Sequence, residues 1–141
     1  MDNVLIDTGF WIALYNERDK HYSKANELQE YLEIANVLVP YPSLYETINT
    51  RLTKKSLSLN DFKRQLEKNN FEIVQDDDYK ADSLEITFNS SLINKRPLSL
   101  VDTIIRQMLA DEHLNINYLI SFNPGDFIDI CTRRGIIIIS D

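Results

Sequence analysis

The sequence predicts an α/β fold with a central, mainly parallel sheet and helices on both faces. Short runs of branched apolar residues, which are typical of buried strands, alternate along the chain with longer segments that have helical spacing of apolar residues. Glycine and proline are scarce, at three and four of 141 residues, which argues against a turn-rich all-β fold. We expect a single domain over residues 1–141, because this length is short for two ordinary domains.

The first half of the chain is expected to contain three strands. Val4, Leu5 and Ile6 form an apolar run that ends at Asp7, and Gly9 is expected to turn the chain into a short helix. Further along, apolar residues recur every three or four positions, as on one face of an amphipathic helix. The expected segments are strands at 4–6, 37–39 and 71–74 and helices at 10–15, 21–35, 43–54 and 57–68.

Two similar patterns predict where helices begin. Ser43 is followed three residues later by Glu46, which is the spacing of a capping box, so a helix is expected to start there after the connection at 40–42. Ser99 and Asp102 repeat this spacing before the most regular apolar stripe of the chain. Both helices therefore carry an acid in the first turn.

The second half continues the alternation of helices and strands. Its expected segments are helices at 79–89 and 100–112, strands at 118–120 and 136–139, and a short amphipathic piece after Phe127. The acidic run at 76–78 is expected to be a loop or the start of a helix. It is not a calcium-binding EF-hand loop, because the alternating ligands, central glycine and final glutamate of that motif are missing.

The net charge of −7 restricts the kinds of partner. A chain that grips nucleic acid through its whole surface is usually basic, so an acidic chain is better suited to a metal ion or a basic partner. The candidates for local contact with phosphate are Arg51, Lys54 and Arg96.

The composition also predicts an intracellular, cytoplasmic protein. The opening residues lack the basic region of a secretory signal, and the longest apolar runs are far shorter than the roughly 20 residues that span a bilayer. Cys131 is the only cysteine, so it cannot form an internal disulfide, and a buried thiol in a reducing compartment is expected.

Acidic residues recur where the chain leaves a strand or enters a helix. Asp7, Glu46 and Asp102 share this placement, while Asn123 and Asp126 follow the strand at 118–120. Since the carboxyl ends of parallel strands lie on one rim, these groups are expected to converge and to need a hard cation such as Mg²⁺ or Mn²⁺. For any one of the three acids taken alone, helix capping is the simpler explanation, whereas all three on one rim favour a site.

The whole chain resembles the PIN-domain family and, in size, its single-domain VapC-like toxins. The segment at 19–25, Asp-Lys-His-Tyr-Ser-Lys-Ala, is similar to the family's segment after the first helix. The main motifs of the resemblance are Val4-Leu5-Ile6-Asp7-Thr8, Ser43-x-x-Glu46, Leu98-Ser99-x-x-Asp102 and the run Ile-Ser-Phe-Asn-Pro-Gly-Asp-Phe at 120–127.

The resemblance implies a metal-dependent ribonuclease that uses Mg²⁺ or Mn²⁺. By similarity, Asp7, Glu46 and Asp102 would be metal ligands and catalytic residues, and the hydroxyls of Thr8 and Ser99 would orient them or their water. It also implies RNA as substrate, a homodimer, and an antitoxin protein as a partner of the toxin.

The fourth acidic position departs from the family pattern. The family usually places an acid shortly after the strand, where this sequence has Asn123, and the nearest carboxylate is Asp126. Asp126 is our choice for the fourth catalytic and metal-binding residue, with Asn123 as an orienting amide. The opposite assignment, and a role of Asp126 as the cap of the next helix, stay open.

Two other functions fit parts of the sequence. The triplet Asp7-Thr8-Gly9 occurs in dimeric aspartic proteases, but their fold is nearly all β, and this chain is rich in helical patterns. The stronger alternative is a catalytically weakened PIN-like scaffold that binds RNA or a protein partner without cutting.

Overall fold

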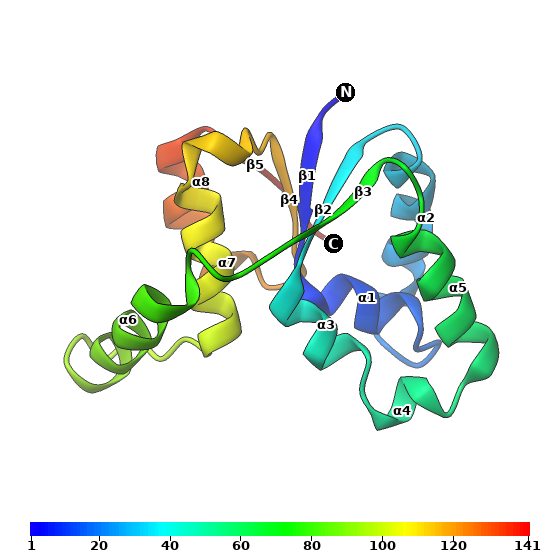
Figure 1. Ribbon diagram of the computed structural model, residues 1–141, viewed down its shortest axis with the longest axis horizontal. Coiled ribbons are helices and arrows are strands. Elements are labelled where there is room, and N and C mark those ends of the chain that lie inside the picture. The colour runs from blue at the N-terminus through cyan, green and yellow to red at the C-terminus, as the bar shows by residue number, and fades with distance from the viewer.

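The computed structural model describes residues 1–141 and contains a five-stranded sheet in the order β3-β2-β1-β4-β5, in which every neighbouring pair is parallel (Figure 1). The predicted fold class is therefore confirmed, and the sheet is parallel throughout. The strands are β1 (Asn3–Ile6), β2 (Asn36–Pro40), β3 (Phe71–Val74), β4 (Tyr118–Ile120) and β5 (Ile137–Ile139).

Eight α-helices cover the two faces of the sheet. Figure 1 places α1, α2 and α5 on one side and α7 and α8 on the other. The helices are α1 (Thr8–Leu14), α2 (Tyr22–Leu32), α3 (Tyr41–Thr47), α4 (Thr50–Thr53), α5 (Ser56–Leu66), α6 (Lys80–Leu92), α7 (Leu100–Ala110) and α8 (Ile128–Arg134). Two 3₁₀ turns, Glu112–Leu114 and Pro124–Asp126, flank β4.

Alternate residues of the strands pack into two separate hydrophobic cores, one on each face of the sheet. Val4 and Ile6 point to the core that contains Trp11 of α1, whereas Leu5 points to the core that contains Met108 of α7. This alternation follows from the two-residue period of a strand. A strand that is buried on both faces needs an uninterrupted apolar run, which is what the sequence shows at these positions.

The prediction of one helix over residues 43–54 is wrong in two respects: the helix begins earlier, and the segment forms two helices. The helix α3 begins at Tyr41, because Pro40 ends β2 in an extended conformation and Pro42 is tolerated in a first turn that needs no backbone donor. Ser43 therefore lies inside the helix and does not cap it. The chain leaves the helix at Ile48, and the Asn49 side chain caps a separate helix, α4, by accepting from Leu52 N at 3.0 Å.

The start of α1 also differs from the prediction. Gly9 lies inside α1 and makes no turn, because Asp7 is the N-cap and the helix begins directly at Thr8. Trp11 has no exposed surface and packs against Phe62 with ring centroids 5.1 Å apart. The aromatic residues of α1 therefore belong to the core.

None of the helices has the length and apolar character required to cross a membrane.

Candidate functional site

Three neighbouring strands end at one edge of the sheet. The strand β1 ends at Ile6, β2 at Pro40 and β4 at Ile120, and all three run in the same direction. Asp7 N donates to Ile120 O at 3.0 Å, so the two residues that follow β1 and β4 stay side by side. In open parallel sheets this edge is where ligands are usually bound.

Asp7 lies at the centre of this edge and is almost completely buried, with 4% of its surface exposed. Its Oδ1 accepts from Thr8 N at 2.8 Å, and its Oδ2 accepts from Ser121 Oγ at 2.8 Å. Burial raises the pKa of the Asp7 carboxyl from 3.8 to about 6; the Ser121 hydrogen bond opposes this rise, and the charges of Asp102 and Glu46 add to it. Asp7 is thus held rigidly in an environment that disfavours its charge.

Glu46 is held in place by a hydroxyl from α1. Thr8 Oγ1 lies 2.9 Å from Glu46 Oε1 and 2.9 Å from Ser43 Oγ. A hydroxyl carries one proton and a carboxylate carries none, so Thr8 donates to Glu46 and Ser43 can supply the proton of the second bond. The contact joins the start of α1 to α3 and leaves most of the Glu46 side chain exposed to solvent.

Asp102 reaches the edge from the other face of the sheet. The predicted cap of α7 is confirmed: Ser99 is the N-cap, and its Oγ accepts from Asp102 N at 3.0 Å. Burial raises the pKa of the Asp102 carboxyl, a hydrogen bond from Ser99 opposes the rise, and the charges of Asp126 and Glu46 add to it. The capping interaction and the placement of Asp102 among other acids therefore coexist.

The four acids are electrostatic neighbours, and none of them forms an ion pair with a lysine or arginine, although the charge of Asp126 is felt by Arg96. Asp7 is affected by Asp102 and Glu46, and Asp102 is affected by Glu46 and Asp126. The lysine and arginine ion pairs of the protein lie elsewhere and involve none of these four carboxylates. The charges of these acids therefore act on one another in pairs, although no three of the acids lie close enough together to hold an ion.

The loop after β4 carries the two candidates for the fourth position. Ser121 Oγ accepts from Asn123 N at 3.1 Å, and the exposed Asn123 side chain makes no hydrogen bond. Asp126 N donates to Asn123 O at 3.2 Å, and Asp126 O accepts from Arg106 Nη1 at 2.8 Å. These backbone contacts hold the turn and leave the Asp126 carboxylate without a protein partner.

Helix capping explains these acids only in part. Asp7 is a cap, but its bond goes to the first helical N–H, and its second oxygen is taken by Ser121. Glu46 lies at the end of α3, where no cap is required, and α8 begins without a side-chain cap, so Asp126 does not cap it. The capping interpretation of Glu46 and Asp126 is therefore wrong.

Two site residues were not singled out by the sequence. Ser121 follows β4 just as Asp7 follows its neighbour β1, so its position after the apolar run was the available signal. Ser43 was interpreted as a cap, whereas it is fully buried and bonds to Thr8, which lies 35 residues away in the chain. No local pattern reveals that contact.

The basic residues suggested for phosphate lie outside this edge. Arg96 is paired with Asp129, with Nη1 3.0 Å from Oδ2, and Arg106 binds the same carboxylate at 2.7 Å. These two guanidinium groups hold the pKa of Asp129 well below its usual range, with the Arg106 hydrogen bond as the larger cause. Arg51 donates from Nη2 to Asn16 Oδ1 at 3.2 Å.

The donor set at the edge suits a hard divalent cation. All four acids offer oxygen ligands, and neither histidine nor cysteine is among them, a set that favours Mg²⁺ or Mn²⁺. A cation would also supply counter-charge to Asp7 and Asp102, whose pKa values are affected by no lysine or arginine. In the structure, no three acidic, histidine or cysteine side chains are close enough together to hold an ion, so the carboxylates are more widely spaced than in a closed metal site.

Comparison with known proteins identifies the family. The sequence matches the family model described as PIN domain over residues 4–131, so the chain belongs to the PIN-domain family. Among solved structures, it is similar to the crystal structure of VapC20 from Mycobacterium tuberculosis, described as a toxin that cleaves the sarcin-ricin loop. The TM-score is 0.68 with 18% identity, covering 89% of this chain and 94% of the other. No curated protein matches the sequence significantly.

The raised pKa of Asp7 predicts an unusual dependence of stability on pH. The folded protein binds a proton on Asp7 more tightly than the unfolded chain does, so ionising this group costs stability as pH rises from about 4 through about 6. In metal-free protein at pH 7.5, Asp7→Asn should therefore raise the free energy of unfolding by about 2 to 3 kcal/mol.

The advantage of Asp7→Asn should shrink as pH is lowered from 7.5 toward 4. Urea unfolding at several pH values in the presence of a chelator measures it. A variant that is less stable than wild type at pH 7.5 would mean that the hydrogen bonds of Asp7 outweigh its charge.

Proposed function

We propose that this PIN-domain protein is a metal-dependent endoribonuclease that hydrolyses RNA phosphodiester bonds with Mg²⁺ or Mn²⁺. The observation that carries the proposal is a set of four carboxylates, linked by charge effects, none of which forms an ion pair with a lysine or arginine. In this assignment the metal ligands are Asp7, Glu46, Asp102 and Asp126. Membership of a family whose members are nucleases supports it.

The chain's own residues would position the ligands. Ser121 and the Thr8 N–H fix both oxygens of Asp7, the Thr8 hydroxyl holds Glu46, and the Ser99 hydroxyl orients Asp102. A divalent cation bound there supplies Lewis-acid chemistry, which activates a water and stabilises negative charge on the leaving oxygen. Asn123, beside Ser121, offers an amide to orient substrate or water.

We further propose that the protein is the toxin of a toxin–antitoxin pair and acts in the cytoplasm. The structural similarity to a VapC toxin supports this proposal, and an antitoxin protein would then be a second partner besides RNA. Cys131, the only cysteine, is buried and unpaired, as expected for a reducing compartment.

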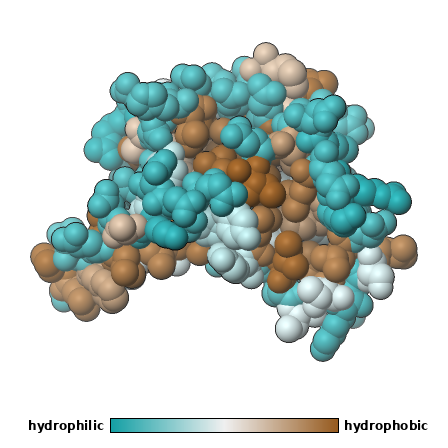
Figure 2. Space-filling view, in the orientation of Figure 1, coloured by the Kyte–Doolittle hydropathy of each residue, from teal (hydrophilic) through white to brown (hydrophobic).

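A homodimer is the third part of the proposal. Leu84, Phe88 and Leu92 follow one another at four-residue intervals on α6 and are 49%, 59% and 69% exposed, and Ile93 beyond them is 70% exposed. Figure 2 shows hydrophobic surface at its lower left, where Figure 1 places α6. Contiguous apolar surface of this kind usually marks an interface.

A non-catalytic scaffold that binds RNA or protein is the alternative function. Two observations favour it: the carboxylates are spaced more widely than in a closed metal site, and an uncharged Asn123 stands where the family usually has an acid. Metal binding and RNA cleavage distinguish the two functions.

Mn²⁺ should stabilise wild-type protein and fail to stabilise Asp102→Asn. A ligand that binds only the folded state at 100 times its Kd adds about 2.7 kcal/mol, which corresponds to a rise of roughly 5 to 10 °C in Tm for a chain of this size. Asp82→Asn is the matched control, since Asp82 is also the acid in a first helical turn but lies on α6. Equal rises in all three proteins would remove Asp102 from the site.

Loss of a residue that only hydrogen-bonds to a metal ligand typically lowers activity roughly 10- to 100-fold. If Asp126 is itself a ligand, Asp126→Ala should reduce metal-dependent cleavage of an RNA pool by more than that. Asn123→Ala should retain most of the activity, because an amide supplies no charge to the ion. The reverse result would assign the fourth position to Asn123. Wild-type protein that cleaves no RNA with either metal would favour the scaffold.

Light scattering coupled to gel filtration should give twice the monomer mass for wild type. A Phe88→Ser/Leu92→Ser variant should elute as a monomer, because the exposed apolar face of α6 is interrupted. A monomer mass for wild type at every concentration would contradict the dimer.

A further inference from the structure

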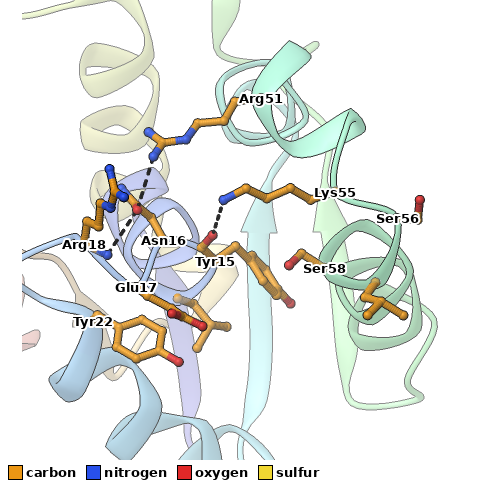
Figure 3. Close-up of a pocket in the computed structure, with 11 residues that line it drawn as sticks. Tyr15, Asn16, Glu17, Arg18, Tyr22, Arg51, Lys55, Ser56 and Ser58 are labelled. Atoms are coloured by element: carbon orange, nitrogen blue, oxygen red, sulfur yellow. Dashed lines mark hydrogen bonds between the residues drawn. The ribbon is translucent and has the colours of Figure 1, made fainter.

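A cavity lies where the end of α1 meets α2, α4 and the start of α5, and none of the four acids lines it (Figure 3). Its volume is about 720 Å³. Three of its lining side chains are cationic, Arg18, Arg51 and Lys55, and one is acidic, Glu17. In a chain with a net charge of −7, this cavity is a local concentration of positive charge.

The three cations have no carboxylate partner. Arg51 donates to Asn16 Oδ1 at 3.2 Å, and Lys55 Nζ lies 3.5 Å from Tyr15 O. The Arg18 side chain makes no hydrogen bond to the protein, although its backbone N–H donates to Asn16 Oδ1 at 3.2 Å. Figure 3 shows the Arg18 and Arg51 guanidinium groups on the same side of the cavity, near Asn16.

These contacts use little of the available donor capacity. A guanidinium has five N–H donors and an ammonium group has three. Arg51 and Lys55 each donate one hydrogen bond, in both cases to a neutral oxygen. Arginine in particular matches the oxygens of a phosphate in a two-pronged geometry. The cavity therefore offers an anion several charged hydrogen bonds that the protein itself leaves unmade.

The cavity also offers a surface for a base. Tyr22 lies on the opposite side of it from Arg51 in Figure 3, and its side-chain hydroxyl makes no hydrogen bond to the protein. An aromatic ring beside cationic groups is the combination that binds single-stranded nucleic acid, since bases stack on the ring while phosphates meet the cations. This combination favours a nucleotide over an acidic peptide, which has no use for the ring.

The cavity is connected to the acidic edge by a single helix. Asp7 caps the N-terminus of α1, and Tyr15 caps its C-terminus. Tyr15 is eight positions after Asp7, so the two ends of α1 are about 12 Å apart at the rise per residue of an α-helix. Arg51 follows α3, the helix that carries Glu46, by one short connection.

We propose that Arg18, Arg51 and Lys55 form a phosphate-binding subsite that holds the backbone of single-stranded RNA a short distance from the acidic edge. The proposal rests on the proposed function for the identity of the ligand as RNA. It separates two tasks: the acidic edge repels phosphate unless a cation is bound, whereas the cavity attracts phosphate without one.

The test is binding of a fluorescein-labelled, single-stranded RNA 12-mer of mixed sequence, followed by anisotropy in EDTA so that no metal-dependent cleavage occurs. Arg51→Gln/Lys55→Gln should weaken binding about 10-fold or more and lower the slope of log K against log salt by about 1.4, or about 0.7 for each lost phosphate contact. Thermal melting verifies that the variant is folded.

Lys95→Gln/Arg133→Gln is the matched control. It removes the same charge, and Lys95 Nζ also lies 3.5 Å from a backbone carbonyl, that of Leu92, but both residues lie far from the cavity in the chain. The control should keep nearly wild-type affinity. An equal loss of affinity in both double variants would overturn the proposal, because the effect would then be one of net charge alone.

The outcomes separate this subsite from the proposed function. If wild type cleaves RNA but Arg51→Gln/Lys55→Gln binds RNA as tightly as the control, the subsite proposal is overturned. The proposed nuclease activity is then unaffected. Wild type that binds RNA through Arg51 and Lys55 but cleaves none supports the subsite and overturns the nuclease. Tighter binding of a labelled oligoglutamate of equal charge would assign the cavity to an acidic protein segment and overturn the proposal.

Discussion

Burial of Asp7 at one edge of a parallel sheet, reinforced by repulsion from neighbouring acids, is the constraint on which the rest of this site depends. Parallel pairing of β1 with β2 and β4 forces the residues after these strands to the same edge, and α7 adds Asp102 from the other face. Burial and neighbouring charge then raise the pKa of Asp7 and Asp102. A site with this charge distribution is organised for a ligand that brings positive charge.

Short hydrogen bonds from hydroxyl groups keep the acids in place against this repulsion. Ser121 donates to Asp7, and Thr8 donates to Glu46, each with an O–O distance below 3 Å. On the other side, Arg106 joins the backbone of Asp126 to Asp129 and so fixes the loop after β4 to α7 and α8. The donors to the Asp7 and Glu46 carboxylates are thus neutral hydroxyls, whereas Arg106 binds the Asp126 backbone and Asp129. The edge itself therefore stays negative.

The fold was predictable because its signals are local. The central strands need continuous apolar runs because they are buried, and all five predicted strands, including the more exposed edge strands β3 and β5, are confirmed within one residue. Asp7 and Asp102 were identifiable because each stands directly where an apolar run or a serine cap marks the boundary of an element. These signals depend only on neighbouring residues in the chain.

The remaining features depend on contacts between distant segments. Ser43 has the spacing of a capping residue, yet its hydroxyl contacts Thr8 because Pro40 and Tyr41 start the helix earlier. The cavity between α1 and α5 is built from residues of 14–22 and 51–58, which are distant in the chain, so Arg51 looked like an ordinary surface cation in the sequence. Such positions become visible only once the strand order and the helix packing are known.

The pKa of the Asp7 carboxyl, measured by carbon-13 NMR titration with and without Mg²⁺, tests the central claim most directly. The account predicts a value of about 6 in metal-free protein, since burial and the neighbouring acids disfavour the charge. It also predicts a fall below the ordinary value when Mg²⁺ is present, because a bound cation stabilises the carboxylate. A pKa that is ordinary without metal, or that does not change with Mg²⁺, would contradict it.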